Sequence, residues 1–426
     1  MAVERPLTIV SSDGHVGARM ADYRPYLDPE HRAEFDDFLP RWEAEGVRSI
    51  DRRSLETRID PEFVDEWSER FLDNGRLDGF ESDPDTRMSE MESEGVAAEV
   101  LFPEFGIPFQ LYSGIAAHLL GRLLERDELK RAGMLAYNRW LADFVATAPE
   151  RFAGMALVSW QQDVPQILRE IRAAKDAGLR GVILPEFDPE EPLYHPRFED
   201  VWSLLEDLEL VVNSHGGLSA TTNKVVFCAA VPHPALAGRI YYHEHAGHIR
   251  NILPHLIWGG VLERHPSITA VFTEMASSWV IDMLVDMDYA YDGSYKSASL
   301  HDALPMRPSE YFQRQCFMGA SLFSRAEIGA RRTFGIDKLM LGMDLPHHEG
   351  TMLRTSPAYL RATLGAEHVP EDEARRMLGA NAAEVFGFDL ESLAPVAARI
   401  GLRPSDVLTP PERDLFPRGD VRRPLV

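Results

Sequence analysis

The residues best suited to chemistry in this sequence are acidic and histidine side chains that follow short apolar runs. Asp13, Gly14 and His15 follow the mainly apolar run 7–10 after two serines. If that run is a β-strand, Asp13 and His15 share a face, because side chains two residues apart point the same way. A carboxylate and an imidazole are both ligands for divalent metals. The triplet alone is a weak signal, and it gains weight from similar residues after later apolar runs.

The elements that must position these residues follow from the alternation of apolar runs and helical spacing. Strands are predicted at residues 7–12, 97–103, 152–159, 181–185, 210–215, 268–274, 315–319 and 339–344. Amphipathic helices are predicted at residues 115–147, 164–177, 197–208 and 249–264. Strands alternating with helices predict parallel βα units, and eight such units predict an α/β protein with a (β/α)8 TIM barrel. An open doubly wound sheet is the alternative, but no Gly-x-Gly-x-x-Gly follows the first strand.

Two long insertions interrupt this alternation. Residues 17–96 separate the first two strands and are predicted to form a helical cap over the barrel mouth. Residues 216–250, between strands five and six, are rich in histidine and are predicted to form a lid. We therefore expect a barrel over residues 1–389 and a Pro-rich C-terminal arm over 390–426, packed on the surface or on a partner subunit.

In a barrel of this kind the chemistry lies at the C-terminal ends of the strands. The residues there are Asp13 and His15, Glu104, Trp160, Glu186, His215, Glu274, and Asp344 with His347 and His348. Buried carboxylates without counter-charges are costly, so a bound cation explains the pattern best. Other roles stay open: a hydrogen-bonded core histidine for His215, a helix N-cap for Asp344, a salt bridge for Glu274, and exposed turn acids for Glu104 and Glu186.

Composition narrows the class of protein. The chain has 426 residues, of which 45% are hydrophobic and 26% charged, as in an ordinary globular protein. No stretch approaches the 18 or so apolar residues that a membrane span needs, and no signal peptide is visible. The formal charge of −24 disfavours nucleic-acid binding. With only two cysteines, Cys228 and Cys316, a reduced cytoplasmic protein is expected.

Four motifs together resemble the amidohydrolase-related (amidohydrolase 2) metal-dependent TIM barrels. They are Asp13-x-His15, the run 256–266, the run 342–348 and the run 381–387. This resemblance extends to about residue 389, and it implies a metal held by Asp13, His15, His215 and Asp344. It also implies C–N or ester hydrolysis, or non-oxidative decarboxylation, as the reaction.

The sequence departs from better-known members of that family in three places. Glu186 stands near the position where two-metal members carry a carboxylated lysine, and Glu274 replaces a common histidine. The cluster His243, His245 and His248 adds candidate ligands. A set of carboxylates and imidazoles without lysine suits a pair of iron ions. In Asp13-Gly14-His15, and in the runs 23–29 and 83–102, the chain resembles the family's nonheme diiron monooxygenases from actinobacterial natural-product (platensimycin/platencin-type diterpenoid) pathways.

The candidate metal ligands and the two resemblances predict two possible reactions, of which the first is favoured. In the first, two iron ions and O₂ hydroxylate an apolar, CoA-linked acyl or terpenoid substrate, with electrons from a separate donor. In that case the predicted metal ligands are Asp13, His15, Glu104, Glu186, His215, His248 and Asp344. The predicted catalytic residues are His245 and Glu274, and Arg239 and Arg250 are predicted to bind the anionic acyl-CoA. In the second, Zn or Mn supports hydrolysis or non-oxidative decarboxylation, with Glu274 or a lid histidine as general base. A homo-oligomer is expected in both cases, and an inactive binding scaffold is a third, less favoured class.

Overall fold

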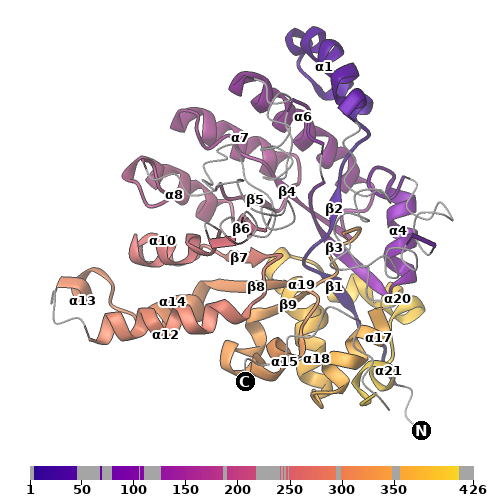
Figure 1. Cartoon of the computed structure of the whole chain (residues 1–426), viewed down its shortest axis with the longest axis vertical. Helices are drawn as coiled ribbons and strands as arrows, with labels where there is room; N and C mark the ends of the chain where they lie inside the picture. Colours follow the sequence, from indigo (N-terminus) through magenta and orange to yellow (C-terminus); the bar gives the residue numbers. More distant parts are fainter. Residues whose placement is uncertain are drawn as a thin grey trace.

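A computed structural model gives the architecture over residues 4–45, 68–69, 79–104, 106–109, 126–185, 190–216, 240, 243, 246–247, 249–293, 299–347 and 356–411. These are the described residues. Parallel strands follow one another around a nearly closed barrel in the order β1-β3-β4-β5-β6-β7-β8-β9, with helices outside (Figure 1). They are β1 (Ile9–Ser11), β2 (His15–Val16), β3 (Val96–Pro103), β4 (Phe152–Ala156), β5 (Gly181–Ile183), β6 (Val211–His215), β7 (Ala270–Thr273), β8 (Cys316–Ser321) and β9 (Leu339–Gly342).

The predicted TIM barrel and its eight strand positions are confirmed. The first strand differs in detail, because it is divided into β1 and β2, which both pair with β3. Between the two pieces, the chain turns toward the last strand. The Ser12 amide donates to the Leu341 carbonyl at 2.8 Å, and Gly14 forms a bridge with Leu345. These contacts bring the first and last strands of the barrel together.

Most of the helices around the barrel bury apolar side chains, whereas α13 buries none. In the described residues they are α1 (Arg32–Glu45), α4 (Pro84–Ser93), α6 (Asp127–Ala146), α7 (Val164–Asp176), α8 (Glu199–Asp207), α10 (Ile252–Trp258), α11 (Val261–Arg264), α12 (Ser278–Asp292), α13 (Ser299–Ala303), α14 (Pro308–Gln315), α15 (Arg325–Phe334), α17 (Ser356–Leu360), α18 (Glu371–Arg375), α19 (Asn381–Phe386), α20 (Leu390–Ile400) and α21 (Pro404–Leu408). Short 3-10 helices lie at η1 (Met20–Tyr26), η2 (Pro29–His31), η5 (Pro196–Phe198) and η6 (Ile336–Lys338), and π-helical turns at η7 (Arg361–Gly365) and η8 (Arg376–Ala380).

Two of the four predicted helices match closely, and a third is divided. Helix α7 begins after Asp163, whose carboxylate accepts a hydrogen bond from the Gln166 amide, as an N-cap should. The helix predicted at 249–264 is instead two helices, α10 and α11. The break falls at Gly260, whose φ of 68° is in the left-handed region and ends the regular helix. For the helix predicted at 115–147, residues 115–125 lie outside the described residues.

The described part of the 17–96 insertion packs through aromatic side chains. Phe38 contacts Phe109 with ring centroids 5.3 Å apart, and Tyr23 meets Trp140 of α6 edge-on at 5.9 Å. At the other end of the insertion, α4 lies beside α20 (Figure 1). The boundaries predicted for the cap, the lid, the barrel at 1–389 and the arm at 390–426 remain predictions. No helix among the described residues is both long and apolar enough to span a membrane.

Candidate metal centre

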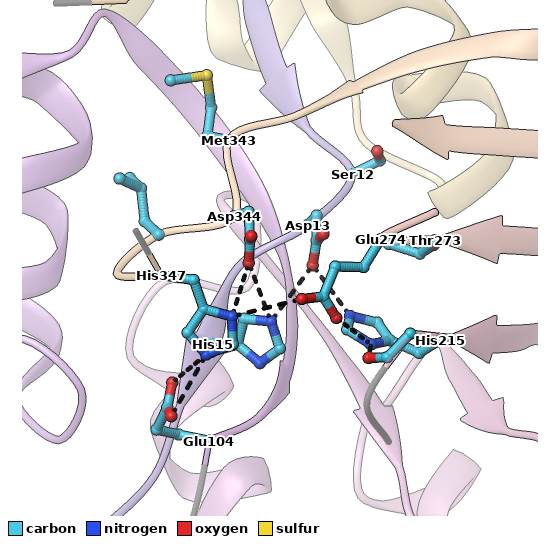
Figure 2. Close-up of polar contacts among 12 residues, drawn as sticks. Ser12, Asp13, His15, Glu104, His215, Thr273, Glu274, Met343, Asp344 and His347 are labelled. Carbon is cyan, nitrogen blue, oxygen red and sulfur yellow. Dashed lines mark hydrogen bonds and ion pairs between the residues drawn. The ribbon is translucent and has the colours of Figure 1, made fainter. Parts of the chain in front are cut away.

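Five of the predicted site residues converge at the C-terminal ends of the strands. Asp13 lies between β1 and β2, and His15 begins β2. His215 ends β6, Glu274 follows β7 and Asp344 follows β9. Figure 2 shows their carboxylates and imidazoles pointing toward one another. All are buried except Glu274, whose side chain is 19% exposed. The structure therefore brings together residues from four separate parts of the chain.

The distances between donor atoms are those of ligands around a common ion. Nε2 of His15 lies 3.2 Å from Oδ1 of Asp344 and 3.6 Å from Oδ1 of Asp13. Nε2 of His215 lies 3.1 Å from the same Asp13 oxygen. Donors that each lie about 2.1 Å from one metal are separated by about 3–3.5 Å. In two overlapping groups the donor atoms all lie within 4.8 Å of one another: Asp13, His15 and His215; and His15, Glu274, Asp344 and His347.

The backbone fixes which nitrogen each histidine presents. Nδ1 of His15 lies 2.9 Å from the Pro103 carbonyl, and Nδ1 of His215 lies 2.7 Å from the Gly216 carbonyl. A carbonyl only accepts hydrogen bonds, so each Nδ1 carries the hydrogen and donates it. Each Nε2 is then left with its lone pair facing the carboxylates, which is how metal-ligating histidines are held.

Buried polar atoms test whether the site suits a cation. Among the described residues, Nε2 of His15 and both carboxylate oxygens of Asp344 are buried without a hydrogen bond of good geometry. Nε2 of His15 and Oδ1 of Asp344 do contact other groups of the cluster, at the imidazole–carboxylate distances of 3.2 Å between them and 3.0 Å from Oδ1 to Nδ1 of His347. A buried polar atom without a good hydrogen bond is costly, and a metal ion would satisfy all three atoms. The donor set of two imidazoles and two carboxylates therefore fits a divalent ion.

The charged groups around His15 also favour a cation at this site. Burial lowers the pKa of His15, and so does the nearby His347. The carboxylates of Asp344, Asp13 and Glu104 raise it by more, so that the pKa of His15 reaches about 9. This field stabilises positive charge at the centre of the cluster, whether a proton or a metal ion carries it.

The backbone is strained at two of these positions. Glu274 has a φ of 56° and Asp344 a φ of 50°, both in the left-handed region that non-glycine residues seldom adopt. Glu274 directly follows β7, and Asp344 is the second residue after β9. Strain of this kind costs about 1–3 kcal/mol and gathers at functional sites.

Glu104 lies beside the cluster and pairs with a residue that was not among the predicted ligands. Nε2 of His347 is 3.2 Å from Oε2 of Glu104, and its Nδ1 is 3.0 Å from Oδ1 of Asp344. The same Nδ1 is 3.7 Å from Oε1 of Glu274. His347 thus links three carboxylates, and its ring stacks on His15 with centroids 4.0 Å apart.

Several other predicted site residues lie outside the described residues. They are Glu186, Arg239, His245 and His248. Arg250 is described, and its guanidinium lies 5.7 Å from the ring centroid of Trp279. The role of Arg250 toward a substrate remains a prediction.

Two features of the site had no predicted role. His347 was named among the residues at the strand ends, three positions after Asp344, but it was not assigned as a ligand. The second feature is a buried ion pair of Arg87 and Glu99, with both side chains 0% exposed. Arg87 belongs to helix α4 and Glu99 to strand β3, and no local pattern predicts that they meet behind the ligands.

Comparisons with known proteins agree with this geometry. A family model described as Amidohydrolase matches residues 120–388. An amidohydrolase from Mycobacterium avium subsp. paratuberculosis K-10 has a similar structure, with a TM-score of 0.65 and 18% identity, over 91% of this chain and 100% of that one. The 5-carboxyvanillate decarboxylase of Sphingomonas paucimobilis gives a TM-score of 0.57 and 16% identity, over 90% and 100% of the two chains.

A third structure shows a metal. The dihydroxybenzoic acid decarboxylase of Polaromonas sp. JS666, solved with bound manganese and the inhibitor 2-nitroresorcinol, gives a TM-score of 0.54 and 15% identity, over 89% of this chain and 97% of that one. No curated protein matches the sequence.

These findings correct the functional prediction. The expected diiron monooxygenase is contradicted, because the similar structures named above are decarboxylases and an amidohydrolase. The expectations of two iron ions, O₂, an acyl-CoA substrate and a separate electron donor rested on that prediction and are not carried further. The physical reason for the error is that carboxylates and imidazoles suit several divalent metals, so residue types at strand ends determine neither the metal nor the number of ions.

Proposed function

This chain belongs to the amidohydrolase family, and from that premise we propose that it is a non-oxidative decarboxylase that uses one divalent metal ion. The observation that carries the proposal is the convergence of four donors: Nε2 of His15 and His215, and the carboxylates of Asp13 and Asp344. The decarboxylases among the structures of the same fold support the reaction type.

Asp13, His15, His215 and Asp344 would hold the ion, with manganese or zinc as the candidates. Bound there, a divalent ion acts as a Lewis acid that draws charge away from a substrate oxygen. The four residues lie at or just beyond strand ends of a nearly closed barrel, where backbone hydrogen bonds such as that from the Asp344 amide to the Asp13 carbonyl hold them. That rigidity is what a metal site with an open position for substrate requires.

Glu274 is the candidate proton carrier. Its side chain is 19% exposed and therefore more open than the fully buried carboxylates of Asp13 and Asp344. Oε2 lies 3.2 Å from Nδ1 of His215, so the group faces both the ligands and the opening. In decarboxylation, the bond between the substrate carbon and the carboxylate breaks, and its electron pair stays on that carbon. A proton from the Glu274 carboxyl would then complete the product.

Hydrolysis is the second candidate, and the same position of Glu274 favours it. A carboxylate beside a metal site can take a proton from water as general base while the water oxygen attacks an ester or amide carbonyl. The acyl C–O or C–N bond then breaks, and the leaving alcohol or amine takes up that proton. Both reactions need the four ligands and Glu274. They differ in the bond that breaks, so product analysis distinguishes them.

The test is metal analysis followed by strictly anaerobic assays. We expect the purified protein to bind about one divalent ion per chain, as sites of this type do. With manganese or zinc added, it should release CO₂ from a member of a panel of hydroxylated benzoates without O₂. Cleavage of esters or amides in place of CO₂ release would establish the hydrolase. Failure to bind any divalent ion, or turnover that requires O₂, would overturn the proposal.

A further inference from the structure

We propose that Arg87 and Glu99 form a positioning pair that holds the segments around His15 and Asp344 in the arrangement that binds metal. The inference rests on the proposed function, since it assumes a metal between these segments. Arg87 comes from helix α4 in the insertion after the first strand, and Glu99 lies on strand β3. Neither residue touches the reacting atoms, so the pair would act through the ligands.

The guanidinium of Arg87 makes four hydrogen bonds in a fully buried place. Nε and Nη2 both donate to Oε2 of Glu99, at 2.9 and 2.7 Å. Nη1 donates to the backbone carbonyl of His15 at 2.7 Å, and Nη2 donates to that of Leu345 at 3.2 Å. The other side of the guanidinium lies over Phe80, at 4.3 Å from the ring centroid. Arginine suits this role because its planar guanidinium can donate hydrogen bonds to several acceptors at once.

The two carbonyls belong to the segments that carry the ligands. His15 is itself a ligand, and Leu345 directly follows Asp344. The Leu345 carbonyl also accepts the His15 amide at 2.7 Å, and the Asp344 amide donates to the Asp13 carbonyl at 2.9 Å. Arg87 therefore completes a set of bonds between the first and last strands of the barrel. Ligand atoms must be held to within about 0.5 Å for tight binding, and these bonds determine the separation of the two segments.

The pair also packs directly against the residue between the first two ligands. A Cβ atom added to Gly14 would lie 2.1 Å from Oε1 of Glu99 and 2.5 Å from Nη2 of Arg87. Asp13 and His15 face the metal site, and Gly14 faces the ion pair on the opposite side of the strand. This contact explains why the motif has glycine at its centre, and it places the pair directly behind the ligands.

A purely structural role is the competing explanation. Removing one partner of a buried ion pair destabilises the fold strongly, because the other charge is left buried without its counter-charge. A structural pair would therefore affect unfolding without affecting metal affinity. Arg331 offers a matched control. It pairs with Glu373 at 2.6 Å, with both side chains about 10% exposed, and joins α15 to α18, which carry no residue of the site.

The experiment measures Mn²⁺ affinity by calorimetry and the thermal unfolding midpoint on the chelator-treated full-length chain. We expect Arg87→Met to weaken Mn²⁺ binding by about 10–100-fold, the usual effect of losing an outer-shell partner of a metal ligand. Arg331→Met should lower the midpoint and leave Mn²⁺ affinity unchanged. Arg87→Lys keeps the positive charge but not the planar guanidinium, and it should restore only part of the wild-type Mn²⁺ affinity.

Wild-type affinity in Arg87→Met, with a lowered midpoint as in Arg331→Met, would overturn the inference and leave the proposed function standing. If Arg87→Met does not fold, Arg87→Lys and Glu99→Gln decide by the same titration: weakened binding supports the pair, and unchanged binding overturns it. A wild-type chain that binds neither Mn²⁺ nor Zn²⁺ would overturn the proposed function as well.

Discussion

Nε2 of His15 lies 3.2 Å from Oδ1 of Asp344, although the two residues come from opposite ends of the barrel sequence. Closure of the barrel makes this contact, because the first and last strands are neighbours in it. The Asp344 amide donates to the Asp13 carbonyl, so the backbone fixes the distance between the two side chains. A site that joins the first and last strands exists only in the fully folded chain. Metal binding and folding should therefore be linked.

Replacing His15 by alanine should abolish metal retention. The variant loses Nε2, and we expect affinity for Mn²⁺ to fall by at least about 100-fold, the upper end of what loss of an outer-shell partner costs. Metal content after dialysis, measured by inductively coupled plasma mass spectrometry, checks this. His301→Ala, at an exposed position on α13, is the control and should keep its metal. Equal metal content in the two variants would contradict the assigned site.

Replacing Glu274 by glutamine should separate proton transfer from metal binding. The amide keeps the shape of the side chain but cannot carry the proton. We expect kcat to fall by about 10²–10⁴-fold, the usual contribution of a general acid or base. Metal content should stay at the wild-type level. A loss of metal together with activity would show that Glu274 is a ligand, as the second donor group of the site allows.

Replacing Gly14 by alanine should destabilise the protein. The new methyl group would overlap the Arg87–Glu99 pair, and overpacking of this kind costs about 1–3 kcal/mol in the free energy of unfolding. Gly17→Ala is the matched control, since its Cβ would lie at 3.4 Å from Glu104 and 3.5 Å from Tyr23, an ordinary contact distance. Urea unfolding measures both. Equal stability of the two variants would mean that the ion pair does not pack against Gly14.

Much of the fold could be predicted from sequence because each strand is a short apolar run. Those runs placed Asp13, His215 and Asp344 at strand ends, where a barrel gathers them. The division of 249–264 at Gly260 was not predicted, since apolar spacing continues across it. Arg87 had no sequence signal, because its partners are set by tertiary contacts with distant segments. The reaction could not be predicted, since one set of ligands serves several metals and chemistries.

Glu92 provides a prediction for the pH dependence of stability. It lies on α4 and accepts hydrogen bonds from Arg399 of α20 and from Arg151, both at 2.7 Å. The hydrogen bond from Arg399, and then Arg151, lower the pKa of Glu92 to about 2, although burial acts against this. A carboxyl whose pKa is lower in the folded state adds stability above its unfolded pKa of 4.5, and that stability is lost as the pH falls toward 2.

Glu92→Gln should therefore reduce the free energy of unfolding at pH 7 by about 1–3 kcal/mol, as expected for hydrogen bonds to charged groups. The difference from wild type should persist down to about pH 4.5 and shrink below it, because wild-type Glu92 then becomes protonated and loses the same attraction. Urea unfolding at a series of pH values measures this. Glu371→Gln removes a pair with Arg375 in which the Glu371 side chain is 51% exposed, and it should change stability by less than about 0.5 kcal/mol. A Glu92→Gln deficit that is constant from pH 7 to pH 3 would show that packing, and not the ion pairs, is what Glu92 contributes.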